Sequence, residues 1–136
     1  MPFDPRADYP LGSRRPDLVE TPSGLALDDV TLEAARAGTL VAGDIRATTA
    51  TLRRQAEVAR VSGRRALADN LDRAAELAGV PDDQLLEIYT ALRPGRSTAP
   101  ELEAWARRLD EWEAPLTAAF VREAAAAYVA RGLLGD

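Results

Sequence analysis

Apolar and polar positions follow a helical period along most of the chain, most clearly in the stretch Val80–Thr98. Its apolar residues recur at spacings of three and four and so share one stripe of a helix: Leu85, Ile88, Tyr89 and Leu92. Pro81 suits the first helical turn, where its missing N–H is not needed. Pro94 cannot continue the helix and restricts Arg93 before it. The pattern predicts a helix that ends in a rigid corner carrying Arg93 and Arg96.

Capping residues and glycines predict the remaining helices. Asp28 and Asp29 are placed to cap a short helix that Gly38 closes. Thr98 and Glu101 have the spacing of a capping box. With these signals, and with Thr48 or Thr49 as a further cap, we expect helices over residues 28–37, 48–62, 65–78, 98–112 and 115–131.

The helix expected at 115–131 is apolar on two sides. One face carries Leu116, Phe120, Ala124, Ala127 and Tyr128, and another carries Val121, Ala125 and Val129. A helix that is apolar on most sides is buried from most sides, either at the centre of a bundle or against a partner. Arg122 and Glu123 interrupt this surface. Arg122 either lies along the surface with its guanidinium in water or belongs to a desolvated interface pair.

Residues 1–24 contain five of the nine prolines and show no helical or alternating period. We expect an extended N-terminal arm here, with Tyr9 and Leu11 as apolar anchors. Residues 25–136 form the helical domain. The predicted fold class is therefore all-α, a compact bundle of about five to six helices with an extended N-terminal arm.

The residue types that are absent restrict the chemistry. The chain has no cysteine, histidine or lysine, which removes thiol, imidazole and Schiff-base catalysis and the usual zinc ligands. The 22 acidic and 17 basic residues give a net charge of −5 without a basic block, which argues against nucleic-acid binding. No apolar run approaches the ~20 residues of a membrane-spanning helix. We expect a cytoplasmic protein with no membrane association.

No catalytic, cofactor-binding or metal-binding residue is predicted. The acidic pairs Asp28–Asp29 and Asp82–Asp83 stand where helices begin, so capping explains them better than catalysis does. Trp105 and Trp112 lie seven residues apart on one stripe, which favours packing over a ligand site. The residues alone therefore predict an all-α interaction domain.

Several ordered segments carry a resemblance to a known family. They are Asp8–Leu11, Leu27–Glu33, Ala74–Leu77, Val80–Asp83, Leu86–Tyr89, Ala91–Pro94, Arg96–Thr98, Ala118–Ala125 and Tyr128–Val129. In order and spacing this set resembles the small (gamma) subunit of adenosylcobalamin-dependent diol and glycerol dehydratases. The similarity runs from about residue 8 to the end of the chain.

The resemblance implies a non-catalytic subunit of an enzyme that converts a 1,2-diol to an aldehyde and water by a radical mechanism. Large (alpha) and medium (beta) subunits, two copies of each with two of this chain, would be its partners. Adenosylcobalamin would lie between the large and medium subunits, with none bound by this chain alone. This family is also associated with packaging in a bacterial microcompartment.

The expected role is to pack on the large subunit and support the assembly. The residues predicted to form the subunit interface are Tyr9, Leu11, Arg93, Arg96, Arg122 and Tyr128. The alternative hypothesis is a stand-alone all-α adaptor with an unrelated protein partner and no enzymatic role. A nucleic-acid binder that uses its arginines is a third hypothesis, which the negative net charge disfavours.

Overall fold

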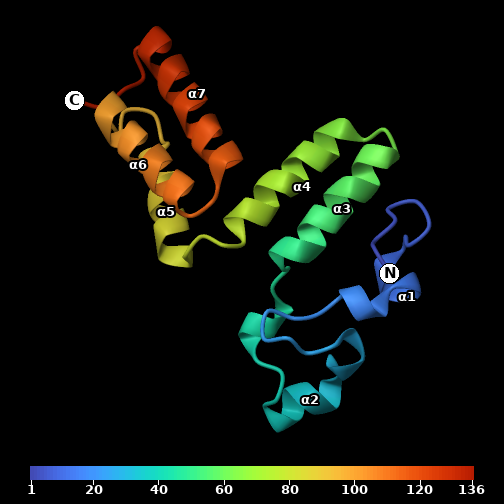
Figure 1. The fold of residues 1–136 in the computed structure, drawn as a ribbon. Coiled ribbons are helices and arrows are strands. Elements are labelled where there is room, and N and C mark those ends of the chain that lie inside the picture. The colour runs from blue at the N-terminus through green and yellow to red at the C-terminus, as the bar shows by residue number, and fades with distance from the viewer. The chain divides into compact units, whose positions relative to one another are not determined.

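The fold was analysed in a computed structural model that describes residues 1–136. It contains seven α-helices and no β-strand, and its one β-type pairing is an isolated bridge between Glu20 and Ala26. The predicted all-α class is confirmed. The chain folds as two compact units, Met1–Ala78 and Gly79–Asp136 (Figure 1). The predicted boundary at residue 24 lies inside the first unit and stays a prediction.

The first unit begins with short elements and ends with a helical hairpin. Its elements in chain order are α1 (Leu11–Arg14), a 3-10 turn (Pro16–Leu18), a second 3-10 turn (Leu27–Asp29), α2 (Leu32–Ala37), a third 3-10 turn (Ala42–Ile45), α3 (Thr49–Val61) and α4 (Arg65–Leu77). Two of these elements fall within the segment predicted as an extended arm. That segment is therefore partly helical.

Helices α3 and α4 lie side by side as a hairpin (Figure 1). Alanines fill their contact, with Ala56, Ala59 and Ala68 buried, and this lets the two backbones approach closely. The Thr49 hydroxyl donates a hydrogen bond of 3.0 Å to the carbonyl of Ala75, which joins the start of α3 to the end of α4. The predicted helices at 48–62 and 65–78 are thus present.

The start of α2 differs from the prediction. Thr31 is its N-cap, and the Thr31 hydroxyl accepts a hydrogen bond from the Ala34 amide at 3.1 Å. Asp28 and Asp29 instead belong to the preceding 3-10 turn. Thr31 has the extended backbone that an N-cap needs. The two aspartates lie in the 3-10 turn before it, so neither directly precedes the first residue of α2. Gly38 closes α2 in the left-handed region, as predicted.

The second unit contains α5 (Asp82–Ala91), α6 (Ala99–Glu111) and α7 (Pro115–Arg131). The capping box predicted for α6 is present: the Thr98 amide donates to Oε2 of Glu101 at 2.7 Å, and the Thr98 hydroxyl accepts from the Glu101 amide. The core of this unit is formed by Val80, Ile88, Leu102, Ala106, Leu109, Ala114, Ala118 and Val121. Half-buried side chains from all three helices pack against it.

The apolar stripe predicted on α5 is only partly buried. Ile88 is in the core and Leu85 and Leu92 pack against it, but Tyr89 is 59 % exposed. Tyr89 belongs with Leu86, which is 68 % exposed, on the outer side of α5. The spacing was consistent with burial of Tyr89, but no element of this unit covers that side.

No helix of the chain is both long enough and apolar enough to cross a membrane.

Candidate subunit interface

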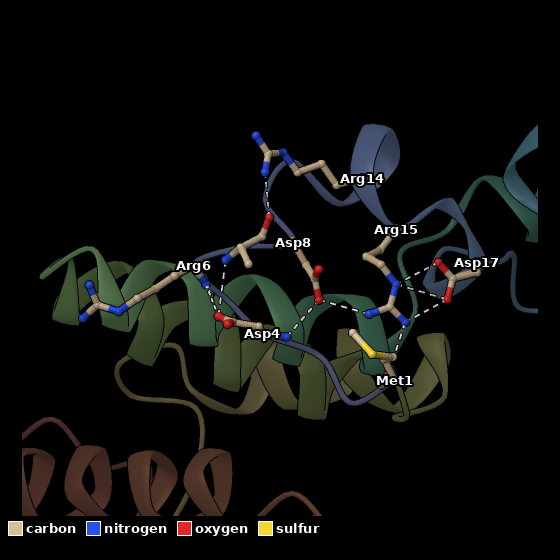
Figure 2. Close-up of polar contacts among 8 residues, drawn as sticks. Met1, Asp4, Arg6, Asp8, Arg14, Arg15 and Asp17 are labelled. Atoms are coloured by element: carbon tan, nitrogen blue, oxygen red, sulfur yellow. Dashed lines mark hydrogen bonds and ion pairs between the residues drawn. The ribbon is translucent and has the colours of Figure 1, made fainter.

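The first candidate region is the N-terminal segment, which a charged network holds together (Figure 2). Arg15 is its centre: Nη1 donates to Oδ2 of Asp8 at 3.0 Å, and Nε and Nη2 donate to the carboxylate of Asp17 at 2.9 Å each. The Arg15 side chain is 17 % exposed. Its hydrogen bonds hold the pKa of Asp17 below its ordinary value and raise the pKa of Arg15.

A second set of hydrogen bonds shapes the turn before this network (Figure 2). Oδ1 of Asp4 accepts from the amides of Arg6 at 2.8 Å and Ala7 at 3.3 Å, and the Asp4 amide donates to Oδ2 of Asp8 at 2.9 Å. Nη1 of Arg14 donates to the Ala7 carbonyl at 3.0 Å. The prolines and acidic residues of this segment therefore form an ordered turn with its own polar contacts.

The structure separates the two apolar anchors predicted in this segment. Leu11, at the start of α1, is 2 % exposed, whereas Tyr9 is 51 % exposed. Leu11 is thus placed inside the first unit, where it holds the segment in position. Tyr9 presents its ring at the surface, where a partner can reach it.

The second candidate region is the corner that carries Arg93 and Arg96. Both arginine side chains are exposed and have no partner within the chain. Gly95 stands between them with a φ of 73°, a left-handed conformation that favours glycine. The corner is thus a turn of defined geometry with two guanidinium groups directed to its surroundings.

The end of the chain straps this corner, a feature that the sequence analysis missed. The Gly95 amide donates to the carbonyl of Leu133 at 2.8 Å, and the Gly135 amide donates to the carbonyl of Ser97 at 2.8 Å. A Cβ on Gly135 would lie 3.0 Å from the backbone of Arg96 and Ser97, so the close approach requires glycine. Residues 133–135 bind the loop at residues 95–97, far away in sequence, and no local sequence pattern predicts such a contact.

Tyr128 also supports the corner. Its side chain is half-buried against the core, and its hydroxyl donates a hydrogen bond to the carbonyl of Leu92 at the end of α5. The Ser97 hydroxyl donates to the Ala91 carbonyl at 2.9 Å and closes the same helix end from the other side of the loop. Within this chain Tyr128 therefore positions the corner.

Arg122 forms a bridge between α7 and α6. Its Nη2 lies 3.1 Å from Oε1 of Glu103 and 2.8 Å from Oδ2 of Asp110. The Arg122 side chain is 40 % exposed, so its guanidinium remains in contact with water. The hydrogen bonds that Arg122 donates to Glu103 and Asp110 raise its pKa. Arg122 is therefore paired within this chain, across α6 and α7, and its half-exposed guanidinium is not desolvated.

A groove lies beside the corner, along α5. It has a volume of about 450 Å³ and is lined by Leu86, Glu87, Thr90, Ala91, Arg96, Ser97 and Trp105.

Trp105 is half-buried, and the guanidinium of Arg108 lies 4.9 Å from its ring centroid and 5.3 Å from that of Trp112. Both tryptophans pack against the core, as the spacing predicted.

The first unit has a further apolar surface that the sequence analysis did not single out. Val30 and Ile45 are exposed at the wall of a hollow of about 280 Å³, and Leu32 and Val41 are exposed nearby in sequence. Asp44 lies buried at its edge and accepts a hydrogen bond from the Val41 amide at 3.0 Å. The hydroxyls of Ser23 and Thr21, together with this amide, hold the pKa of Asp44 below its ordinary value. Val41 and Ile45, apolar residues between the helices expected at 28–37 and 48–62, were the available signal for this surface.

The chain contains no group of three or more acidic side chains arranged to hold a metal ion. Asp82 and Asp83 lie in the first turn of α5, where their charge favours the helix dipole. The surface carries groups of exposed apolar side chains, the exposed Arg93 and Arg96, and the two shallow hollows described above. Such a surface is typical of a helical chain that binds other proteins.

Comparison with known proteins gives the family of this chain. The family model "Dehydratase small subunit" matches residues 5–135. A propanediol dehydratase small subunit from Citrobacter freundii is 54 % identical over 131 residues, which cover 95 % of this chain and 76 % of the relative. Another from Salmonella typhimurium is 52 % identical over 132 residues, 96 % of this chain and 76 % of the relative. The chain belongs to the dehydratase small-subunit family.

Proposed function

We propose that this chain is the small subunit of a coenzyme B12-dependent diol dehydratase, which converts propane-1,2-diol or glycerol to an aldehyde and water. The observation that carries the proposal is the match of residues 5–135 to the small-subunit family, together with 52–54 % identity to two propanediol dehydratase small subunits. The enzyme class that follows is a hydro-lyase, and this chain contributes to it without a catalytic residue of its own.

The proposed role of the chain is to pack on the large subunit and support the assembly. Large aliphatic and aromatic side chains are exposed on α5, on α7 and around the hollow of the first unit. Burying such surface contributes roughly 25 cal/mol per Å² of apolar area, so these groups favour association with a partner chain. The partners in this proposal are large and medium subunits, two copies of each with two of this chain.

Adenosylcobalamin is proposed to bind between the large and medium subunits. When bound there, it supplies the radical chemistry of the reaction. The residues of this chain do not fit the cofactor: it has no histidine that could coordinate cobalt, and the hollows described above are open, with volumes of only about 450 and 280 Å³. We therefore assign no step of the reaction to residues of this chain.

The interface residues divide into two kinds in this proposal. Tyr9, Arg93 and Arg96 are exposed and are proposed to contact a partner directly. Leu11, Arg122 and Tyr128 are proposed to act through the shape of this chain, because their contacts are internal. The proposed location is the cytoplasm, within a microcompartment where the organism builds one.

Co-expression with large and medium dehydratase subunits tests the proposal. One affinity step on a tag carried by this chain is expected to recover all three chains in equal amounts. Recovery of this chain alone, folded and monomeric, would contradict the proposal and leave the stand-alone adaptor as the better account. Binding of a DNA or RNA duplex that weakens steeply with salt would instead support a nucleic-acid role.

A further inference from the structure

The buried apolar residues of the first unit are mostly small. Only Leu11 and Val58 are larger than alanine, and the set consists of Leu11, Ala56, Val58, Ala59, Ala68 and Ala75. Hydrophobic stabilisation grows with the apolar area that folding removes from water, and an alanine side chain is a single methyl group. The alanine contact between α3 and α4 therefore packs closely but contributes little hydrophobic stabilisation.

The second unit buries larger side chains in a shorter segment. Five aliphatic residues larger than alanine are buried in its core: Val80, Ile88, Leu102, Leu109 and Val121. Both tryptophans of the chain and Tyr128 pack against this core. The second unit thus removes more apolar area from water for its length, and we expect it to be the more stable of the two.

Larger apolar side chains of the first unit lie at its surface instead. Four of them are exposed in the turn-rich segment before α3: Val30, Leu32, Val41 and Ile45. Hydrogen bonds hold this segment, among them the bond of 3.1 Å from the Leu25 amide to the Thr21 hydroxyl. The net contribution of such bonds to stability is small, because the unfolded chain forms equivalent bonds with water. Polar contacts therefore do not replace the missing apolar burial.

Each unit draws its core from its own part of the chain. The residues that form or pack against the core of the second unit lie between Val80 and Leu134, and the cluster in the α3–α4 hairpin lies between Ala56 and Leu71. Loss of one of these clusters removes no residue from the other. Parts of a protein with separate cores are expected to open as separate cooperative units.

We propose that the two units unfold separately and that the first opens before the second. The chain then has a partly folded state in which α5, α6 and α7 keep their packing while α3 and α4 have lost theirs. Opening of the first unit leaves the arginine corner in place, because the contacts from Leu133, Gly135 and Tyr128 all lie in the second unit. The inference does not depend on the proposed function, since it follows from the two cores alone.

Urea unfolding of the full chain, followed by two probes, tests the inference. Trp105 and Trp112 both lie in the second unit, so tryptophan fluorescence reports on that unit. Far-ultraviolet circular dichroism reports on helices, and each unit holds about half of the α-helical residues. We expect about half of the helical signal to be lost in a first step at lower urea, and fluorescence to change only in a second step. Coincident transitions, or a fluorescence change that comes first, would overturn the inference.

Two matched substitutions assign each step to its unit. Ala56 is the eighth of the 13 residues of α3, Ala106 is the eighth of the 13 residues of α6, and both are 0 % exposed. Glycine at either position removes a buried methyl group and weakens the helix, which is expected to lower the midpoint of its own step by about 0.5–1 M urea. Ala56→Gly is expected to move the first step and Ala106→Gly the second. If Ala56→Gly prevents the first unit from folding, the first step disappears and the fluorescence step is unchanged. A fluorescence step that moves in Ala56→Gly would overturn the inference.

Hydrogen exchange of the full chain without urea gives a further measurement. Helices α3 and α6 have the same length, so their amides can be compared directly. We expect the amides of α3 to exchange about tenfold faster than those of α6 or more, because they are exposed by opening of the first unit alone. Equal protection of the two helices would overturn the proposed order of opening.

Discussion

The amide of Gly95 donates a hydrogen bond of 2.8 Å to the carbonyl of Leu133, which joins the loop after α5 to the end of the chain. A second bond, from the Gly135 amide to the Ser97 carbonyl, doubles the connection. These two backbone hydrogen bonds hold the loop that presents Arg93 and Arg96. The arginine corner therefore depends on residues that follow the last helix.

Gly135→Ala tests this strap. The new methyl group would meet backbone atoms of Arg96 and Ser97 at 3.0 Å, so the strap has to move away and both hydrogen bonds weaken. We expect faster hydrogen exchange at the Gly95 amide and a loss of about 1–3 kcal/mol in the free energy of unfolding. Gly43→Ala is the control, because a methyl group there meets no atom within 4 Å. Unchanged exchange at Gly95 would contradict the role of the strap.

Tyr128→Phe removes the hydroxyl that bonds the Leu92 carbonyl and keeps the ring in the core. The expected cost is about 1 kcal/mol of unfolding free energy, as for a typical half-buried hydrogen bond. Urea unfolding of the full chain measures it. Tyr89→Phe, at a position 59 % exposed, is expected to leave stability unchanged. Equal effects of the two substitutions would show that the Tyr128 hydroxyl has no such role.

Glu113 offers a stabilising substitution. It lies in the turn between α6 and α7 with a φ of 57°, which is unfavourable for a residue with a Cβ. Glu113→Gly is expected to raise the unfolding free energy by about 0.5–1 kcal/mol, seen as a higher thermal midpoint. Arg107→Gly, at an exposed position in the interior of α6, is expected to lower it by about 1 kcal/mol. Changes of the same sign would contradict this account of the turn.

Acid is expected to weaken the first unit through Asp44. The hydrogen bonds from Ser23, Val41 and Thr21 lower the pKa of this carboxyl below its ordinary value of 3.8. A pKa that is lower in the folded chain stabilises the fold above the unfolded-state pKa, and this contribution is lost as the pH falls through the folded-state value. Stability is therefore expected to fall below about pH 4.

Asp44→Asn measures that contribution. We expect the variant to be less stable than the wild type at pH 7 and to lose less stability between pH 7 and pH 3, because the titrating group is gone. Asp29→Asn removes an exposed carboxylate of the same unit and serves as the control. Parallel pH profiles for wild type and Asp44→Asn would show that this carboxyl is not responsible.

Local signals in the sequence were sufficient for most helix limits. The Thr98–Glu101 box and the left-handed Gly38 depend on neighbours three or four residues away, and both lie where they were predicted. The cap of α2 was assigned to Asp28 and Asp29 instead of Thr31. Aspartate and threonine cap almost equally well, so the choice depends on the 3-10 turn that precedes the helix.

Contacts between distant segments were beyond sequence reasoning. The partners of Arg122 are Glu103 and Asp110, which only the packing of α6 against α7 brings within reach. The same applies to the strap at Gly95. Tyr89 was predicted to lie on the apolar stripe of α5, yet its side chain is exposed. Residue spacing defines such a stripe but does not show which part of it a neighbouring helix covers. The same holds for α7: its spacing predicted two apolar faces but did not show that the face with Leu116 and Phe120 is exposed in this chain.

The most direct test of the central claim is the activity of the co-purified complex. The three-subunit complex is expected to convert propane-1,2-diol to an aldehyde only when adenosylcobalamin is added, and this chain alone is expected to convert none. Diol-dependent aldehyde formation by this chain alone, or a fully assembled complex that remains inactive with the cofactor, would show that the chain is not the small subunit of such an enzyme.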